Sequence, residues 1–317
     1  MLALNAEQIL DLVSTPRLVE ALRDVFRAGR VVTERTPTSM PGGAGDRLFV
    51  SMLAMDLDGG AAIKLLTILP DNPPKGLLTI QGAIVVFSKT GAPVAILDGA
   101  VVTYLRTGAT SALASQYLSR PDSSHLVIMG TGALAPTMAA SHCAVRPITQ
   151  VSVWGRRPEQ AGATAAAIRE RVSGDINVLV SRSIEETVAT ADIVSCSTSS
   201  STPILAGKWL KSGAHVDLVG SFQPHKRESD DEVVLRSRIF VDTFQGALHE
   251  GGDVVDPISR GIITLDRIEG QLEDLASGRV TGRVKDDEIT MFKSVGTAIE
   301  DLAAARLIVE AASGQIS

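Results

Sequence analysis

The chain has 317 residues, a formal net charge of −6 and no basic stripe with interleaved aromatic side chains. These features argue against a nucleic-acid partner. Charged residues make up 21% of the chain and aromatic residues only 3%, which is typical of an α/β protein with an aliphatic core. Cys143 and Cys196 lie in apolar stretches and indicate a reducing compartment, so we expect a cytoplasmic protein with neither a membrane span nor a signal peptide.

The first hundred residues predict a helix followed by strands. Apolar residues recur with helical periodicity over residues 5–28. Four segments then predict strands, and a turn at residues 89–91 joins the last two. The predicted strands are residues 47–55, 61–69, 82–88 and 93–98. A helix is expected over residues 101–118.

From residue 125 onward, short apolar segments alternate with helical ones, which predicts a parallel, doubly wound Rossmann sheet. The predicted strands are residues 125–129, 150–154, 177–180, 192–197, 215–218 and 239–242, and the predicted helices between the earlier ones are 135–145, 158–172 and 183–190. A final helix over residues 291–312 is expected to return to the first domain. We therefore predict a Rossmann domain at residues 119–299 and a discontinuous second domain at residues 1–118 and 300–317.

A glycine-rich turn follows the first strand of the predicted Rossmann domain. In a Gly-x-Gly-x-x-Ala turn, the first glycine permits the tight bend and the second lets backbone N–H groups approach a pyrophosphate. The turn carries our predicted cofactor-binding residues Gly130, Thr131, Gly132, Ala133 and Leu134, with Ala135 at the start of the helix. A purely structural turn is the alternative, but the strand–helix–strand context favours a dinucleotide site.

The end of the second strand indicates which dinucleotide is bound. An NAD site expects an acidic residue there, whereas this chain has Arg156 and Arg157. Guanidinium groups pair with a 2′-phosphate through two hydrogen bonds, so we predict NADPH, with NADH as a weaker alternative. A solvated arginine pair at the start of the next helix would be the structural explanation. The loop at residues 195–202, with Thr198, lies where the adenosine half of the cofactor is expected to pass.

Three cations in the first 107 residues are candidates for substrate binding. Lys64 interrupts an otherwise apolar strand, and an unpaired lysine is costly to bury, so it must reach water or meet an anion. Arg35 and Arg106 lie before and after it in the chain. For each residue alone, a solvated or internally paired cation remains the simpler interpretation.

Several segments resemble the ornithine cyclodeaminase/μ-crystallin family, in order and over nearly the whole chain. They are residues 64–79, 90–99, 103–109, 130–132, 219–221 and 292–305, the last of which contains Phe-Lys-Ser-Val-Gly-Thr-Ala and Glu-Asp-Leu-Ala-Ala-Ala. The resemblance implies a Rossmann domain, a discontinuous substrate-binding domain and a homodimer. It also implies that Arg35, Lys64 and Arg106 bind the α-carboxylate of the substrate.

One position departs from the family pattern. Cyclodeaminases and the related alanine dehydrogenases carry a catalytic aspartate where this chain has Phe222. Phenylalanine cannot accept a proton, and neither Asp217 nor Asp230 is an obvious substitute. The segment resembles instead the family branch that reduces cyclic ketimines, in which an apolar residue suits the ring carbons of the substrate.

We therefore expect an NADPH-dependent reductase that transfers hydride to C2 of a cyclic imino acid. Its products would be L-proline from Δ1-pyrroline-2-carboxylate and L-pipecolate from Δ1-piperideine-2-carboxylate. Lys64, with a pKa lowered by Arg35 and Arg106, is the expected catalytic residue at the imine nitrogen, and Val295 is expected to pack on the nicotinamide. The alternatives are an ornithine cyclodeaminase, an alanine dehydrogenase-like 2-oxo acid reductase and a non-enzymatic crystallin-like binder. The five histidines show no metal-ligand spacing, so no metal is predicted.

Overall fold

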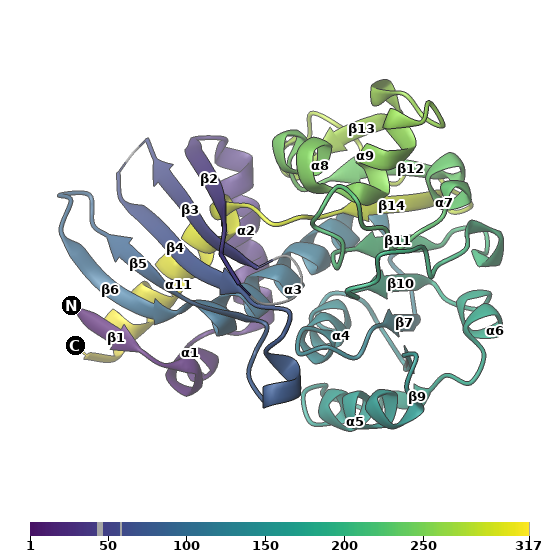
Figure 1. Cartoon of the computed structure of the whole chain (residues 1–317), viewed down its shortest axis with the longest axis horizontal. Helices are drawn as coiled ribbons and strands as arrows, with labels where there is room; N and C mark the ends of the chain where they lie inside the picture. Colours follow the sequence, from purple (N-terminus) through teal and green to yellow (C-terminus); the bar gives the residue numbers. More distant parts are fainter. Residues whose placement is uncertain (43–46, 58, 317) are drawn as a thin grey trace. The chain divides into compact units, whose positions relative to one another are not determined.

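The computed structural model describes residues 1–42, 47–57 and 59–316, which form two compact units. Unit 1 comprises Met1–Thr107 and Thr297–Ser317, and unit 2 comprises Gly108–Gly296. Each unit has its own β-sheet (Figure 1). The first boundary divides helix α3 (Gly99–Leu118), whereas the sequence-based boundary lay at the end of this helix.

The sheet of unit 1 has six strands in the order β1-β6-β5-β4-β3-β2. The strands are β1 (Leu2–Leu4), β2 (Val31–Ser39), β3 (Leu48–Asp56), β4 (Ala61–Ile68), β5 (Ile80–Phe87) and β6 (Pro93–Asp98). From β2 to β6 each strand pairs antiparallel with the next, and β1 joins β6 in parallel. The four predicted strands are confirmed, whereas β1 and the more polar β2 were not predicted.

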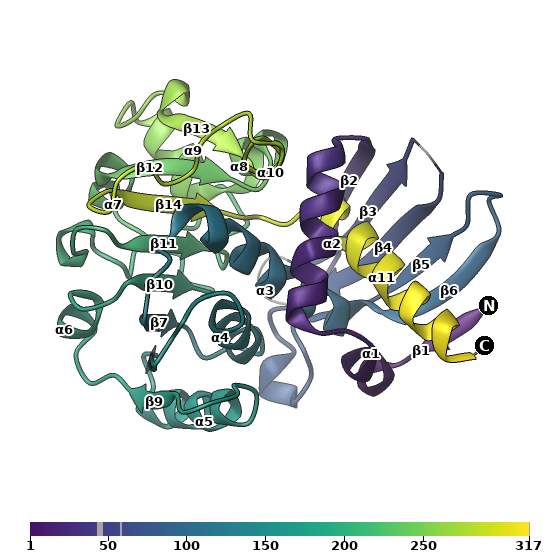
Figure 2. The same cartoon turned by 180° about the vertical axis from the view of Figure 1, so that it is seen from behind.

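Two long helices cover one face of this sheet. Helices α2 (Thr15–Ala28) and α11 (Ala298–Ile316) lie on the same side of it (Figure 2). Alternate side chains of the strands point toward them, so that Val50, Met52 and Ile84 are buried. Unit 1 therefore completes its core only with the last segment of the chain.

The prediction of a single helix over residues 5–28 was wrong. The segment forms α1 (Ala6–Leu12) and α2, separated by extended backbone at Val13 and Ser14. Pro16 lies in the first turn of α2, where its missing N–H costs nothing, but within a continuous helix it would remove a backbone hydrogen bond.

The predicted helix over residues 291–312 begins too early. Residues 291–293 belong to strand β14 (Ile289–Lys293), which pairs on both sides in the sheet of unit 2. Gly296, between β14 and α11, has a φ of 84°, a left-handed conformation that neither a strand nor a helix adopts. The apolar side chains at 291–292 thus belong to a buried strand rather than to a helix face.

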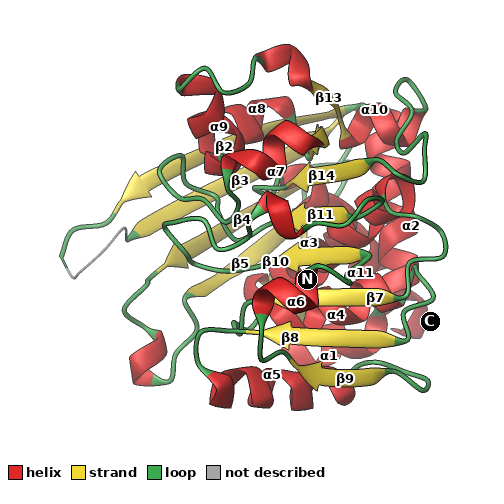
Figure 3. Ribbon diagram, turned by 90° about the vertical axis from the view of Figure 1, so that its right-hand side faces the viewer, coloured by secondary structure: helices red, strands yellow, loops and turns green. Residues whose placement is uncertain are grey.

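The sheet of unit 2 is parallel throughout, as predicted for a doubly wound fold, and Figure 3 shows its strands side by side. Its order is β13-β12-β14-β11-β10-β7-β8-β9. The strands are β7 (His125–Met129), β8 (Gln150–Trp154), β9 (Asn177–Val180), β10 (Ile193–Cys196), β11 (His215–Leu218), β12 (Ser237–Val241), β13 (Ile268–Gln271) and β14. The six strands predicted from residue 125 onward are confirmed, and β13 and β14 are additional.

Helices of unit 2 enclose a sheet whose core is almost entirely aliphatic. They are α4 (Ala135–Cys143), α5 (Pro158–Arg169), α6 (Ile184–Val188), α7 (Asp231–Arg236), α8 (Phe244–Glu250), α9 (Gly252–Ser259) and α10 (Leu272–Ser277). Among the residues described, no helix combines the length and the apolar character that crossing a bilayer requires.

Candidate active site

The glycine-rich turn connects β7 to α4 as the sequence predicts. Gly130 has a φ of 128°, and a Cβ atom there would lie 2.7 Å from the carbonyl oxygen of Ser197. By contrast, no described heavy atom lies within 4 Å of a Cβ placed on Gly132. Leu134 precedes α4 without a side-chain cap. The turn therefore offers open space beside an uncapped helix N-terminus, as a pyrophosphate site requires.

The turn also lies close to the end of β8. A Cβ atom on Gly155 would lie 2.5 Å from Cγ2 of Thr131. Arg156 and Arg157 follow directly, and both side chains are exposed. Neither forms a salt bridge with a residue in the described part of the chain, so both guanidinium groups can bind an external anion.

A buried carboxylate fixes the loops that follow β10 and β11. Glu228 accepts hydrogen bonds from the backbone N–H of Thr198 (2.7 Å), Gly220 (2.7 Å) and Ser221 (3.3 Å). Burial raises the pKa of Glu228 to about 7, whereas the nearby Lys293 lowers it. No role was predicted for Glu228 from the sequence, although this residue links the loop of Thr198 with the segment that carries Phe222.

Gly220→Ala is expected to lower the free energy of unfolding by roughly 1–3 kcal/mol or more. The added Cβ would lie 2.1 Å from the carbonyl oxygen of Thr198 and 2.5 Å from Oε1 of Glu228, so backbone must move. Urea denaturation measures the change. Gly132→Ala is the matched control, because its Cβ enters open space. Equal stability of the two variants would contradict the crowding at Gly220.

Phe222 lies half-buried in the loop after β11. The two aspartates near it in sequence have structural partners. Asp217 is buried within β11 and accepts hydrogen bonds from the hydroxyls of Ser111 and Ser195. Asp230 caps α7 by accepting from the N–H of Val233. Neither carboxylate replaces the family aspartate at position 222.

Unit 1 brings two of the three predicted cations together with two carboxylates of α11. Lys64 donates to Oδ1 of Asp301 (2.8 Å) and to the hydroxyl of Thr103 (3.4 Å). Arg106 donates from Nε to the same Asp301 oxygen (3.2 Å) and also pairs with Glu300. All four charged side chains are almost fully buried. Lys64 and Arg106 are thus internally paired cations, which is one of the two interpretations given above for each of them.

Arg35 lies in the same cross-strand row as Lys64. It pairs with Met52 of β3, which in turn pairs with Lys64 of β4, so the three side chains share one face of the sheet. Neighbouring strands are about 4.8 Å apart, which places the two Cα atoms roughly 10 Å apart. Arg35 is half-buried, so it belongs to the same region as the buried pair.

Burial lowers the pKa of Lys64 to about 8, the attraction of Asp301 raises it, and Arg106 lowers it further. The pKa of Lys64 is lowered, as the sequence predicts. The largest cause is burial of the ammonium group, not repulsion by the neighbouring arginines. Glu300 and Asp301 lie in a segment that carries the family resemblance, but no role was predicted for them. An adjacent acidic pair in an otherwise apolar helix was the signal that could have identified them.

Val295 lies in the segment between β14 and α11, and it is held by another carboxylate that sequence reasoning missed. Asp242 accepts hydrogen bonds from the N–H of Val295 (2.7 Å), from the N–H of Gly296 (2.7 Å) and from the hydroxyl of Ser294 (3.1 Å). The backbone at Val295 is therefore fixed, and its role beside a nicotinamide ring stays a prediction.

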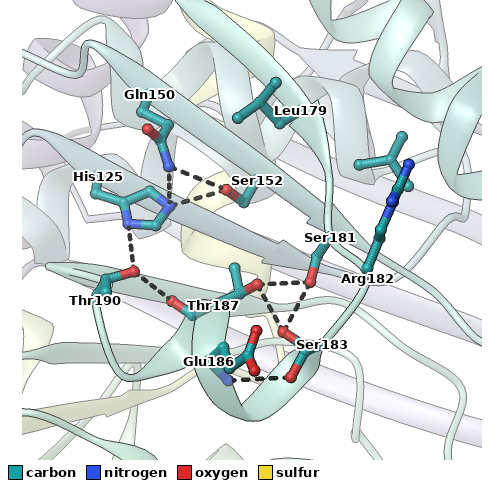
Figure 4. Close-up of a pocket in the computed structure, with 11 residues that line it drawn as sticks. His125, Gln150, Ser152, Leu179, Ser181, Arg182, Ser183, Glu186, Thr187 and Thr190 are labelled. Atoms are coloured by element: carbon teal, nitrogen blue, oxygen red, sulfur yellow. Dashed lines mark hydrogen bonds between the residues drawn. The ribbon is translucent and has the colours of Figure 1, made fainter.

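Unit 2 contains a cavity of about 260 Å³ between β8, β9 and α6. Its polar lining is largely satisfied internally (Figure 4): His125 contacts Ser152 at 2.9 Å, Gln150 at 3.0 Å and Thr190 at 3.3 Å. None of the predicted site residues lines it. Nor do the described residues contain a group of three or more His, Cys, Asp or Glu side chains that could hold a metal ion.

Solved structures of other proteins resemble this chain over nearly its whole length. A structure of the Thermococcus litoralis Delta(1)-pyrroline-2-carboxylate reductase in complex with NADH and L-proline superimposes with a TM-score of 0.94 at 31% identity, covering 99% of this chain and 98% of that one. An archaeal alanine dehydrogenase dimer with bound NAD gives a TM-score of 0.90 at 29% identity, covering 100% and 97% of the two chains.

The amino-acid sequence is also similar to that of a Delta(1)-pyrroline-2-carboxylate reductase. The Delta(1)-pyrroline-2-carboxylate reductase of Colwellia psychrerythraea is 36% identical over 320 residues, or 98% of this chain and 99% of that protein. The sequence model of the ornithine cyclodeaminase/mu-crystallin family matches residues 4–315. Because the family model and this relative both match nearly the whole chain, the chain belongs to the ornithine cyclodeaminase/mu-crystallin family.

Proposed function

We propose that the protein is an NAD(P)H-dependent reductase of the C=N bond in cyclic imino acids, with Δ1-pyrroline-2-carboxylate and its six-membered homologue as substrates. The observation that carries this proposal is the buried pair Lys64 and Arg106 in a chain similar over its whole length to a reductase of this substrate. An apolar Phe222 at the position of the catalytic aspartate supports reduction over deamination.

Each residue then has a defined task. Arg35, Lys64 and Arg106 bind the substrate carboxylate, and Phe222 packs against the ring carbons. When bound, a reduced nicotinamide would supply the hydride for a new C–H bond at C2, and the C=N π electrons would move to the nitrogen. Lys64 holds a proton at that nitrogen, since its ammonium group has three N–H donors and makes two hydrogen bonds to described residues.

We further propose that NADPH is preferred to NADH. The support is the exposed pair Arg156 and Arg157 at the end of β8, where a carboxylate would otherwise meet the ribose hydroxyls. The Thermococcus litoralis relative was solved with NADH, so the preference in this chain rests on its own arginines. The pyrophosphate would bind at the turn of Gly130–Leu134, with Thr198 beside the adenosine half.

The first test measures loss of NADPH absorbance with Δ1-pyrroline-2-carboxylate, alongside NADH, pyruvate with ammonia, and L-ornithine. Rapid oxidation of NADPH with the imine supports the proposal. Ammonia release from L-ornithine would instead indicate a cyclodeaminase, and faster turnover of pyruvate would indicate an alanine dehydrogenase. The latter is the second candidate, because the archaeal alanine dehydrogenase superimposes with a TM-score of 0.90.

The value of kcat/KM is expected to fall as the pH rises above about 8. Lys64 has a pKa of about 8 in the folded protein, and deprotonation removes both its charge and its proton. The decline is at most about tenfold per pH unit for a single group. A profile from pH 6 to 10 tests this, and Lys64→Met should lack the decline. The same decline in Lys64→Met would assign it to another group.

We also propose a homodimer formed through the uncovered face of the unit 1 sheet. The helices lie on the opposite face (Figures 1 and 2), and this face exposes apolar side chains. They are Val32, Phe49, Met55, Leu65 and Ile96, each between 36% and 50% exposed. Patches of this kind mark interaction surfaces. Sedimentation equilibrium should give the mass of two chains, and a monomer at micromolar concentration would contradict the proposal.

A further inference from the structure

We propose that Asp301 is the positioning residue of this site: its carboxylate holds Lys64 and Arg106 in one arrangement and keeps Lys64 protonated. The inference rests on the proposed function, because it concerns the two cations that would bind the substrate carboxylate. Asp301 lies on α11 and supplies the negative charge that Lys64, Arg106 and Phe222 cannot supply.

The geometry sets Asp301 apart from its neighbour. One oxygen, Oδ1, accepts from Nζ of Lys64 at 2.8 Å and from Nε of Arg106 at 3.2 Å. Glu300, one residue earlier, bonds Arg106 and makes no hydrogen bond to Lys64 among the described contacts. Asp301 is therefore the carboxylate that fixes the distance between the two cations.

Two like charges so close together would otherwise repel one another. Lys64 is 1% exposed and Arg106 is 5% exposed, so water does little to screen them. Thr103 of α3 contributes only a hydroxyl contact at 3.4 Å, and Arg35 of β2 adds a further positive charge in the same row of the sheet. The negative charge in direct contact with Lys64 is that of Asp301, which opposes the effect of burial on the pKa of Lys64, and the charge of Glu300 opposes it more weakly.

The hydrogen bonds that Asp301 accepts all come from the two cations. Oδ2 is buried and accepts no hydrogen bond from the residues described. Buried structural carboxylates normally satisfy both oxygens, as Glu228 does with three backbone N–H groups. Among the described residues, Asp301 accepts hydrogen bonds from Lys64 and Arg106 alone, so its carboxylate serves the two cations.

The test compares Asp301→Asn with the matched variant Glu300→Gln in pH profiles of kcat/KM. Removing an opposite charge at contact distance should move the alkaline decline of Asp301→Asn down by about one to three pH units. Glu300→Gln loosens Arg106 and is expected to raise KM, but its decline should remain within about half a unit of the wild type. Asp301→Glu keeps the charge, so its alkaline decline should lie close to that of the wild type.

A second readout does not depend on activity. Between pH 8 and 10.5 the folded protein has lost the Lys64 proton that the unfolded chain still holds, so stability gains from each rise in pH. In Asp301→Asn this gain should begin at a lower pH in urea denaturation, and it should be absent when Lys64→Met is the background. Glu300→Gln again serves as the control.

The outcomes separate the two proposals. If the imine is not reduced but the denaturation series shifts as stated, the proposed function fails and the role of Asp301 toward Lys64 stands. The role is overturned if Asp301→Asn leaves both pH dependences where the wild type has them, or if Glu300→Gln moves them equally. Should Asp301→Asn fail to fold, Asp301→Glu decides: a shift as large as that expected for the asparagine variant overturns the role.

Discussion

Lys64→Met is expected to lower kcat/KM for Δ1-pyrroline-2-carboxylate by roughly 30- to 5,000-fold, which corresponds to about 2–5 kcal/mol for truncating one member of a buried, hydrogen-bonded charge pair. The substitution removes an ammonium group that is fully buried against Asp301 and leaves that carboxylate to Arg106 alone. Steady-state kinetics at pH 7 measures the loss. A fall in kcat beyond the loss of substrate affinity would assign Lys64 a role in proton transfer as well as in binding.

The matched control is Lys89→Met, since Lys89 is an exposed lysine in the hairpin turn of the same unit. It should retain wild-type kinetics. Urea denaturation of both variants separates loss of chemistry from loss of fold, because leaving a buried charge unpaired is itself destabilising. A folded Lys64→Met protein with wild-type kcat/KM would refute the site.

Replacing Arg156 and Arg157 together by alanine is expected to lower kcat/KM for NADPH by about 100-fold or more and to change that for NADH only a few-fold. Each charge-assisted hydrogen bond to the 2′-phosphate contributes roughly 1.5–3 kcal/mol, and NADH has no such group. The measured quantity is the ratio of kcat/KM for the two cofactors. Because both side chains are exposed, the wild-type ratio should also fall as ionic strength rises.

Arg17→Ala tests whether an exposed arginine elsewhere has the same effect. Arg17 lies on α2 in unit 1 and should leave the cofactor ratio unchanged. An equal loss with NADPH and NADH in the double variant would mean that the arginines serve the fold or a shared part of the cofactor. A wild-type preference for NADH would contradict the proposal directly.

The sequence predicted the alternating strands and helices from residue 125 onward better than the segments near the two ends of the chain. Strands β7, β8, β9 and β11 lie within their predicted bounds, because short apolar runs bounded by polar turns can only be buried in a parallel sheet. The break between α1 and α2 was missed because helical periodicity continues through Ser14. Strand β14 was assigned to a helix because its few apolar residues fit both periods.

In the candidate site, the residues that lie beside a strand were predicted, whereas the buried carboxylates were not. The turn at Gly130 and the arginines after β8 follow from local sequence, since each acts through its position beside a strand. Glu228, Asp242 and Asp301 were not recognised, because a carboxylate becomes informative only when its partners are known. Those partners lie far away in the chain: Asp301 is 237 residues from Lys64, and no local pattern joins them.

Because unit 1 is discontinuous, the ribosome synthesises its last segment only after the whole of unit 2. Helix α11 is made after the whole of Gly108–Gly296, which at about 5–20 residues per second is a delay of roughly 10–40 s. Throughout that interval the sheet has emerged, while the helix that covers β3 and β4 and the carboxylate that meets Lys64 do not yet exist. A chain whose translation ends within this interval would carry a unit 1 sheet with α2 but without α11 on its helix-bearing face.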